Sequence, residues 1–224
     1  IDSHIKLCIL DPLDKVDQKR PSKPQDIVLY GFGRIGRLVS RIMAQMTGPG
    51  NYYRLKAIVV RKGEDTRDLL KRASLLRRDS VHGSFHGTIR VDNETETLVI
   101  NGNPIKIIYA NGPKDFKYSD YGIDNPIVID NTGVWREEKA LSFHLESGAS
   151  KVVLTAPGKG KIKNIVNGIN NSILNESDKI ISAASCTTNA IVPVLDIINK
   201  KYSITWGHIE TVHAYTNDQN LIDN

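Results

Sequence analysis

One cysteine of this 224-residue sequence lies where its sulfur could act as a nucleophile. Cys186 follows the apolar stretch 180–184, which predicts the end of a buried strand, and precedes a periodic apolar run that predicts a helix over residues 187–198. The start of a helix offers unpaired backbone N–H groups and the positive end of the helix dipole, and both favour an anion. This setting favours the reactive thiolate at neutral pH. The alternative is an unreactive core cysteine, which is the commoner case among apolar neighbours.

A cysteine nucleophile needs a base within hydrogen-bonding reach, and six histidines are available. His213 is the strongest candidate, because it ends the apolar stretch 209–212, predicted as a short strand that begins near His208, and opens a polar run. Polar residues that follow a strand are typical of functional sites. His144, in contrast, is predicted to lie on an amphipathic helix. A structural histidine is the alternative for His213.

The glycine pattern of residues 31–36 predicts a phosphate-binding turn, because it follows a predicted strand over residues 27–30 and opens a predicted helix over residues 36–46. In the dinucleotide-binding fingerprint Gly31 permits the tight turn, Gly33 permits close approach to a pyrophosphate, and Gly36 permits close helix–strand packing. The backbone N–H groups of the helix start then face the phosphates. A purely structural glycine turn is the alternative.

The choice between NAD and NADP is left open by the second predicted strand, residues 55–60. NAD enzymes usually carry an acid after this strand, which binds the ribose hydroxyls of the adenosine. Here Arg61 and Lys62 follow instead, and they could accept the 2′-phosphate of NADP or could be solvated loop charges.

Strand and helix signals alternate from Asp26 onward, which predicts an α/β fold with a mostly parallel sheet of the Rossmann type. Residues 1–25 contain three prolines and are predicted to be a leader or linker. The remaining predicted helices cover residues 65–76 and 136–147, and the remaining predicted strands cover residues 87–91, 97–100, 104–109, 126–130, 151–155 and 179–182.

Composition argues against several classes of protein. The net charge of +5 comes from scattered Lys and Arg with interleaved acids, which indicates mild attraction to phosphates rather than nucleic-acid binding. No apolar run approaches the roughly 18–20 residues that span a bilayer, so no membrane association is expected. Two cysteines and no secretory leader favour a reducing cytoplasm over a disulfide framework, and no metal site is predicted.

Taken together, the motifs resemble those of phosphorylating glyceraldehyde-3-phosphate dehydrogenases, in a longer bacterial form, over about residues 27–224. The motifs that carry this resemblance are SCTTN at 185–189, HAYTNDQ at 213–219, YGFGRIGR at 30–37, RDSVHG at 78–83, NTGV at 131–134 and LTAP at 154–157.

The resemblance implies a cysteine thioester mechanism. The thiolate of Cys186 would attack the aldehyde of D-glyceraldehyde 3-phosphate, and His213 would pair with the thiolate and then remove the hydroxyl proton as hydride leaves for NAD or NADP. Inorganic phosphate would cleave the thioester to 1,3-bisphosphoglycerate. The implied substrate- and phosphate-binding residues are Ser185, Thr187 and Thr216. The implied cofactor-binding residues are Gly31, Gly33, Arg34, Ile35, Gly36, Arg61, Thr132, Gly133 and Thr155.

The resemblance also implies how the chain is organised. Residues 26–186 would form the NAD(P)-binding domain, and residues 187–224 would begin a truncated α+β catalytic domain whose remainder would lie beyond Asn224. The full-length enzyme would be a cytoplasmic homotetramer that acts in glycolysis or gluconeogenesis. We expect these 224 residues alone to bind the cofactor weakly at best and to turn over substrate negligibly.

Two departures from the family pattern bear on the cofactor and not on the reaction. The acid after the second strand is absent, and residues 110–113 read Ala-Asn-Gly-Pro where the family commonly has Glu-Arg-Asp-Pro. The alternative functions are the related oxidation of erythrose 4-phosphate and a cofactor-binding module without catalysis.

Overall fold

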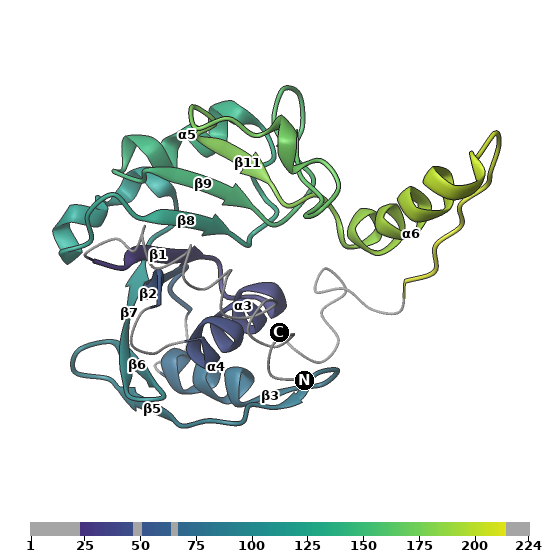
Figure 1. The fold of residues 1–224 in the computed structure, drawn as a ribbon. Helices are drawn as coiled ribbons and strands as arrows, with labels where there is room; N and C mark the ends of the chain where they lie inside the picture. Colours follow the sequence, from purple (N-terminus) through teal and green to yellow (C-terminus); the bar gives the residue numbers. More distant parts are fainter. Residues whose placement is uncertain (1–22, 47–50, 64–66, 214–224) are drawn as a thin grey trace, which may run out of the picture.

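The fold is known from a computed structural model, which describes residues 23–46, 51–63 and 67–213. Within these ranges nine strands form one sheet in the order β10-β11-β9-β8-β1-β2-β7-β6-β5, and β3 pairs with β4 (Figure 1). The strands are β1 (Gln25–Tyr30), β2 (Tyr53–Val60), β3 (Arg78–Asp79), β4 (Gly83–Ser84), β5 (Ile89–Asp92), β6 (Thr97–Ile100), β7 (Asn103–Tyr109), β8 (Ile127–Asp130), β9 (Lys151–Leu154), β10 (Lys163–Asn164) and β11 (Ile180–Ser182). The helices are α3 (Arg34–Gln45), α4 (Asp68–Arg77), α5 (Glu138–Glu146) and α6 (Cys186–Tyr202), with 3₁₀ turns η2 (Pro113–Asp115), η3 (Tyr118–Tyr121) and η4 (Asn171–Ile173).

The sheet is parallel from β10 through β7, and only β6 and β5 run antiparallel at its edge. The predicted α/β fold with a mostly parallel sheet is confirmed. Strands β5 and β6 form a hairpin, since Asp92 pairs with Thr97 across the turn.

The central strands are apolar along their whole length because both faces of the sheet are covered. Ile27 and Leu29 of β1 belong to a core that includes residues of α3 and α4. The alternate residues Val28 and Tyr30 belong to a second core that contains Tyr118. Successive side chains of a strand point to opposite faces, so a strand buried on both faces must be continuously apolar.

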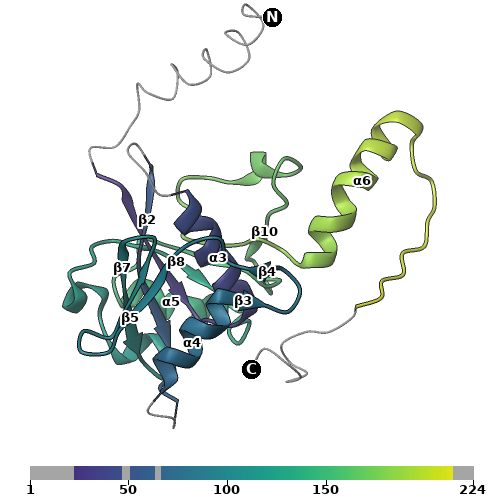
Figure 2. The ribbon, with the colours of Figure 1, turned by 90° about the horizontal axis from the view of Figure 1, so that it is seen from below.

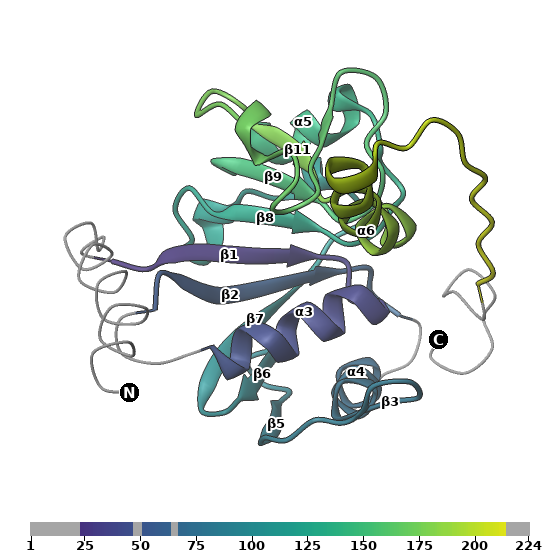
Figure 3. The ribbon, with the colours of Figure 1, turned by 45° about the vertical axis from the view of Figure 1, so that its right-hand side comes forward.

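Helices α3 and α4 lie on one face of the sheet, and α5 lies on the other (Figure 3). Leu141 of α5 is fully buried against Val152 and Leu154 of β9. The three layers leave the carboxyl ends of the parallel strands accessible at one edge, and this edge carries the loops predicted to bind a ligand.

Helix α6 extends away from the sheet (Figures 1 and 2). None of its side chains is buried against the described part of the chain, and Val194, Ile197 and Tyr202 expose 51%, 68% and 72% of their surface. Within the described ranges, none of the helices has both the length and the apolar character that crossing a membrane requires.

Several predicted boundaries were wrong by a few residues. Helix α3 starts at Arg34 and not at Gly36, α4 covers Asp68–Arg77, α5 starts at Glu138, and β5 starts at Ile89. Terminal turns carry few side-chain contacts, so sequence patterns locate them poorly.

The predicted strand at residues 209–212 was wrong. This stretch, with His208 beside it, forms no strand, and Val212 exposes 95% of its surface. A strand requires a hydrogen-bonding neighbour, and the described residues supply none here, so β-branched composition alone does not produce one.

Candidate functional site

The first part of the site lies where the order of the strands reverses. From β1 the chain proceeds to β2 on one side, and β8 on the other side of β1 leads to β9. Such a reversal leaves a crevice at the carboxyl ends of the two strands, and ligands of open α/β sheets bind there. A cavity of about 540 Å³ occupies this position. It is lined by Tyr30, Gly31, Phe32, Gly33, Arg37, Val59, Val60, Arg61, Asp68, Lys71, Arg72, Leu75, Ala110, Asn131, Thr132, Val134 and Trp135.

Two glycines allow the loop after β1 to pass close to its neighbours. Gly31 has φ +92°, and a Cβ there would stand 2.8 Å from Thr132 Cγ2. A Cβ on Gly36 would stand 2.4 Å from the carbonyl oxygen of Gly31. Neither position accepts a side chain, so the backbone itself forms the cavity wall.

The start of α3 is suited to an anion. Its N-cap residue is Gly33, which makes no side-chain capping bond and which lines the cavity. The N–H groups of the first helical turn are therefore not taken by a capping side chain, and they carry the positive end of the helix dipole. The cradle of Gly31, Gly33 and Gly36 fits the pyrophosphate of a dinucleotide.

Arg34 is held by the segment that follows α4. Its guanidinium lies 3.4 Å from Asp79 and donates to the Ser80 hydroxyl at 3.0 Å. Arg34 and Ile35 do not line the cavity, and Ile35 exposes 47% of its surface. The structure thus places the predicted pyrophosphate residues at the helix start, with the Arg34 side chain turned to Asp79.

Asp79 is a buried carboxylate with an unusually low pKa. Burial acts to raise its pKa, but hydrogen bonds from the His82 backbone, the His82 side chain and the Val81 backbone outweigh it, and with Arg34 they lower the pKa to about 2. The charged form of Asp79 therefore stabilises the folded state.

The part of the cavity lining that comes from α4 and the loop after β2 carries charges that bear on the cofactor. Arg61, Lys71 and Arg72 line it together with one acid, Asp68. The Asp68 carboxylate accepts from Arg72 Nε at 2.7 Å and from the Tyr109 hydroxyl at 3.2 Å. Burial, together with the charge of Asp68, raises the pKa of Tyr109 to about 12, so its hydroxyl donates this bond at neutral pH.

Sequence patterns missed Asp68 as a site residue. It lies in the first turn of α4, yet its Oδ1 would be 2.9 Å from a Cβ on Gly63, in the loop that follows β2. An acid therefore does lie beside the end of β2, and it is supplied by the following helix and not by the strand end.

The predicted residues Thr132 and Thr155 are both bound to Asp130, the last residue of β8. Thr132 donates to the Asp130 carboxylate through its backbone N–H at 2.8 Å and its hydroxyl at 2.7 Å. Thr155 donates to the Asp130 carbonyl oxygen through its N–H at 3.0 Å and its hydroxyl at 3.1 Å. Gly133 follows with φ +64° and receives a bond from Arg136 on its carbonyl oxygen.

The second part of the site is the start of α6. Cys186 is exposed and is the first residue of this helix, one residue before the predicted helix start. The N-cap residue Ser185 accepts from the Thr188 N–H at 3.0 Å, and its hydroxyl lies 2.7 Å from that of Thr188. The helix start is thereby fixed by a side-chain cap, which typically contributes about 1 kcal/mol.

The turn between β11 and Cys186 has an uncommon backbone conformation. Ala184 has φ +59°, and its N–H donates to the hydroxyl oxygen of Ser182 at 3.0 Å. Ser182 has no exposed surface, and its hydroxyl donates to the Ala156 carbonyl oxygen at 2.7 Å. A left-handed alanine is unfavourable, so this hydroxyl holds the turn that directs the chain into Cys186.

The structure brings His213 to the start of α6, twenty-seven positions from Cys186 (213 − 186 = 27). The His213 Nε2 lies 3.2 Å from the Thr187 hydroxyl. Neither Cys186 nor His213 lines the cavity. Thr216 lies outside the described residues. Across the residues that are described, no three His, Cys, Asp or Glu side chains gather where they could hold a metal ion.

Two family descriptions match the chain. The NAD binding domain of glyceraldehyde 3-phosphate dehydrogenase matches residues 25–138, and the C-terminal domain of the same enzyme matches residues 185–224. The chain belongs to the glyceraldehyde 3-phosphate dehydrogenase family. The predicted family and the predicted Rossmann-type domain, followed by part of a C-terminal domain, are thus confirmed.

Relatives in the glyceraldehyde 3-phosphate dehydrogenase family extend well beyond this chain. A glyceraldehyde-3-phosphate dehydrogenase-like protein of Pseudomonas aeruginosa (strain UCBPP-PA14) is 62% identical over 200 residues, which are 89% of this chain and 43% of that protein. The glyceraldehyde-3-phosphate dehydrogenase of Thermotoga maritima is 39% identical over 197 residues, 88% of this chain and 56% of that protein. That of Zymomonas mobilis is 37% identical over 198 residues, with the same two shares of 88% and 56%. The chain spans about half the length of the curated relatives it matches.

We predict that Gly36→Ala damages the cradle. The added Cβ would lie 2.4 Å from the Gly31 carbonyl oxygen, and such overpacking costs about 1–3 kcal/mol. Urea denaturation should report this loss, and NAD titration should report at least about fivefold weaker binding, since 1.4 kcal/mol corresponds to tenfold. The matched control is Gly102→Ala, at a turn glycine with φ +82° and no atom within 4 Å of the added Cβ. Gly102→Ala should lower the free energy of unfolding but leave NAD binding unchanged. If Gly102→Ala and Gly36→Ala weakened NAD binding equally, the role of Gly36 would be contradicted.

We predict that Asp79 stabilises the fold in a pH-dependent manner. Its pKa falls from 3.8 to about 2 on folding, so its contribution is fully present above about pH 4 and is lost as the pH falls toward 2. Asp79→Asn should cost about 2 kcal/mol at pH 7, from the size of that shift. Chemical denaturation between pH 3 and pH 7 should show the two proteins converging at the acid end, and a pH-independent difference would contradict this account.

Proposed function

We propose that this chain takes part in the phosphorylating oxidation of D-glyceraldehyde 3-phosphate to 1,3-bisphosphoglycerate, with NAD as hydride acceptor. The observation that carries this proposal is the exposed Cys186 at the capped start of α6, with the His213 imidazole bound to the adjacent Thr187. A nucleophile and a base at one helix start form the arrangement that covalent aldehyde oxidation requires.

In the proposed reaction the Cys186 thiolate attacks the aldehyde carbon, and the oxyanion that forms takes a proton from the His213 imidazolium to give a hemithioacetal. His213 takes the proton of its hydroxyl as the hydride departs, and a thioester remains on Cys186. Phosphate then attacks the thioester carbon, the acyl phosphate leaves, and the thiolate is regenerated. The bound nicotinamide supplies the two-electron acceptor. The backbone N–H groups at the start of α6 stabilise the oxyanion.

We assign substrate and phosphate oxygens to the hydroxyls of Ser185, Thr187 and Thr216. This assignment is supported by the position of both residues at the start of α6, Ser185 as the N-cap and Thr187 in the first turn, where the helix dipole favours anions. Arg34 and Ile35 at the start of α3, with Gly31, Gly33 and Gly36, would hold the pyrophosphate, and the loops at Thr132, Gly133 and Thr155 would hold the nicotinamide half.

We propose that NADP is accepted beside NAD. Arg61, Lys71 and Arg72 outnumber the single acid Asp68 at the end of the cavity that would receive the adenosine. Asp68 suits the ribose hydroxyls of NAD, and the cations suit a 2′-phosphate.

The domain assignment of residues 26–186 and 187–224 is retained as a proposal. It is supported by β11, which ends at Ser182 within the sheet, and by α6, which leaves the sheet at Cys186. Because Cys186 and His213 lie outside the cavity, we expect negligible turnover from these 224 residues alone.

The proposed chemistry requires a reduced thiol, which agrees with the cytoplasm. We propose a homotetramer for the full-length enzyme, and light scattering on that protein tests its mass.

Two alternatives predict different results. Oxidation of erythrose 4-phosphate would use the same cysteine chemistry, and comparison of the two sugar phosphates in full-length protein separates them. A module that only binds the cofactor would bind NAD without selective reactivity at Cys186.

We predict that iodoacetamide at neutral pH labels Cys186 faster than Cys8, because Cys186 is exposed at a helix start whose N–H groups and dipole attract an anion. Peptide mass spectrometry measures both rates in one sample. His213→Gln should slow labelling of Cys186 several-fold, while His208→Gln, at an exposed histidine five positions earlier in the chain (213 − 208 = 5), should not. Equal slow labelling of the two cysteines would favour the cofactor-binding module.

We predict opposite cofactor effects from Arg61→Gln and Asp68→Asn. Loss of a charge-assisted hydrogen bond costs about 1.5–3 kcal/mol, so Arg61→Gln should weaken NADP binding at least about tenfold and change NAD binding less than about twofold. Asp68→Asn should weaken NAD binding and spare NADP binding. Titrations followed by fluorescence of Trp135, which lines the cavity, measure these affinities in a Trp206→Phe background. If Arg61→Gln weakened both cofactors equally, a 2′-phosphate contact would be ruled out.

A further inference from the structure

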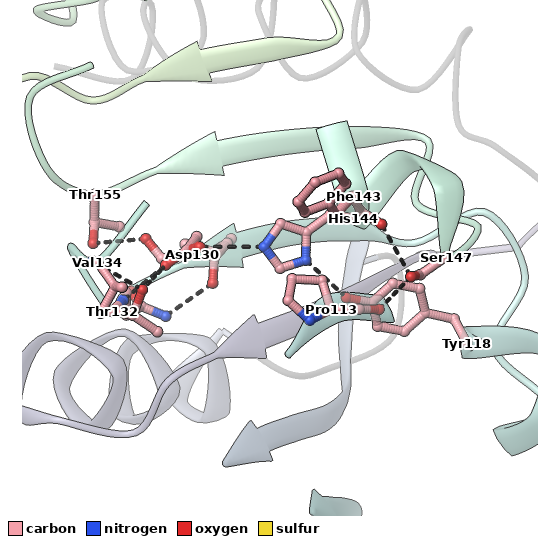
Figure 4. A network of polar contacts seen from close by, with 11 residues as sticks. Pro113, Tyr118, Asp130, Thr132, Val134, Phe143, His144, Ser147 and Thr155 are labelled. Carbon is pink, nitrogen blue, oxygen red and sulfur yellow. Dashed lines mark hydrogen bonds and ion pairs between the residues drawn. The ribbon is translucent and has the colours of Figure 1, made fainter. Parts of the chain in front are cut away.

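A buried polar network links β8, α5 and η3 (Figure 4). Asp130 Oδ2 is 3.2 Å from His144 Nε2, and His144 Nδ1 is 3.4 Å from the Tyr118 hydroxyl. None of the three side chains has exposed surface. Buried polar groups of this kind are costly unless each donor meets an acceptor, so the positions of their protons are constrained.

Proton counting assigns the direction of each bond. Burial, with the nearby Tyr30 and Asp130, raises the pKa of Tyr118 far above its ordinary value, so its hydroxyl keeps its proton. Within the described residues His144 Nδ1 is the hydrogen-bonding partner of this buried hydroxyl, so the hydroxyl donates its proton there. The ring proton of His144 then resides on Nε2 and is donated to Asp130. This tautomer gives each of the two contacts one proton.

Two aromatic side chains join this network to the cavity. Tyr30 and Trp135 line the cavity, and their ring centroids lie 4.7 Å and 6.2 Å from that of His144. His144 is therefore separated from the cavity by one layer of rings, which keeps water away from its bond to Asp130.

The other carboxylate oxygen of Asp130 controls Thr132. Oδ1 accepts from both the N–H and the hydroxyl of Thr132, so the only hydroxyl proton of Thr132 is used. The Thr132 oxygen also accepts from the Val134 N–H at 3.2 Å. Its remaining capacity is a single lone pair, which can only accept a hydrogen bond.

We propose that Asp130, held by His144 and Tyr118, is a positioning residue that makes the Thr132 hydroxyl an obligate acceptor, and that Thr132 thereby binds a ribose hydroxyl of the dinucleotide. This inference rests on the proposed cofactor site.

The partner follows from the chemistry of the ligand. Phosphate oxygens accept hydrogen bonds at neutral pH, so they pair with the N–H groups at the start of α3 and not with Thr132. A ribose hydroxyl can donate. The two walls of the crevice thus bind different groups of the ligand. The Gly33 side donates hydrogen bonds to the phosphates, and the Thr132 side accepts a hydrogen bond from a ribose hydroxyl.

The experiment is a double-mutant cycle on ligand affinity, read from Trp135 fluorescence in the Trp206→Phe background, with NAD and ADP-ribose as probes. ADP-ribose retains both riboses and lacks the nicotinamide. Thr132→Val removes the acceptor and keeps the methyl group that faces Gly31. Thr132→Val should lower the affinity for both probes by about fivefold, as expected for the loss of one neutral hydrogen bond.

His144→Leu removes the donor to Asp130, whereas His144→Gln can supply an N–H in its place. His144→Leu alone should weaken the binding of both probes by about the same fivefold factor as Thr132→Val. In a chain that already carries Thr132→Val, adding His144→Leu should weaken binding by less than about a further twofold. His144→Gln should restore affinity to within about twofold of the unsubstituted chain. A purely structural role for His144 would instead lower the melting temperature and give losses that add to those of Thr132→Val.

Three results would overturn the inference: additive losses, a loss with NAD but not with ADP-ribose, or no loss from Thr132→Val. Failure of the unsubstituted chain to bind either probe would instead remove the proposed cofactor site, on which the inference rests. If His144→Leu does not fold, ¹⁵N chemical shifts of the His144 ring in the unsubstituted chain decide the matter. A neutral Nε2–H tautomer supports the inference, and an Nδ1–H tautomer or an imidazolium contradicts it.

Discussion

The loop after β1 and the loop after β8 approach each other so closely that no side chain fits between them. Gly31 meets this constraint with a left-handed backbone, and Gly36 lets α3 begin directly against the same turn. The cavity at the carboxyl edge of the sheet depends on this contact. It joins the two halves of the sheet at their reversal point, and it makes one wall of the cavity from backbone, which is where N–H groups can meet an anion.

Buried polar groups at strand ends fix the loops around that contact. Asp130 ends β8 and binds both Thr132 and Thr155, and Ser182 ends β11 and binds both Ala156 and Ala184. Each is fully buried, so its hydrogen bonds are not exchanged with water and the loops have few alternative positions. The rigidity of the site thus comes from the sheet and reaches the loops through these two residues.

The cysteine end of the site is organised differently. Cys186 is held by local structure, namely the Ser185 cap and the left-handed Ala184, while α6 itself has no side chain buried against the described part of the chain. His213 lies beside the start of α6, where its ring makes an exposed contact with the Thr187 hydroxyl. The cavity and the cysteine are therefore two separately built parts, and the turn from Ser182 to Cys186 is the connection between them.

The sequence alone determined the features that depend on neighbouring residues. These are the glycine turn, the continuous apolar strands, the helix that begins at Cys186, and the membership in the glyceraldehyde 3-phosphate dehydrogenase family. Only the tertiary structure decided the features that depend on distant residues. It brought Asp68 to the end of β2, it placed His144 between Asp130 and Tyr118, and it left residues 209–212 without a strand partner. Periodicity records which face of an element is apolar, but it does not record which buried polar groups will meet across that face, because such pairs are set by packing between elements far apart in the chain.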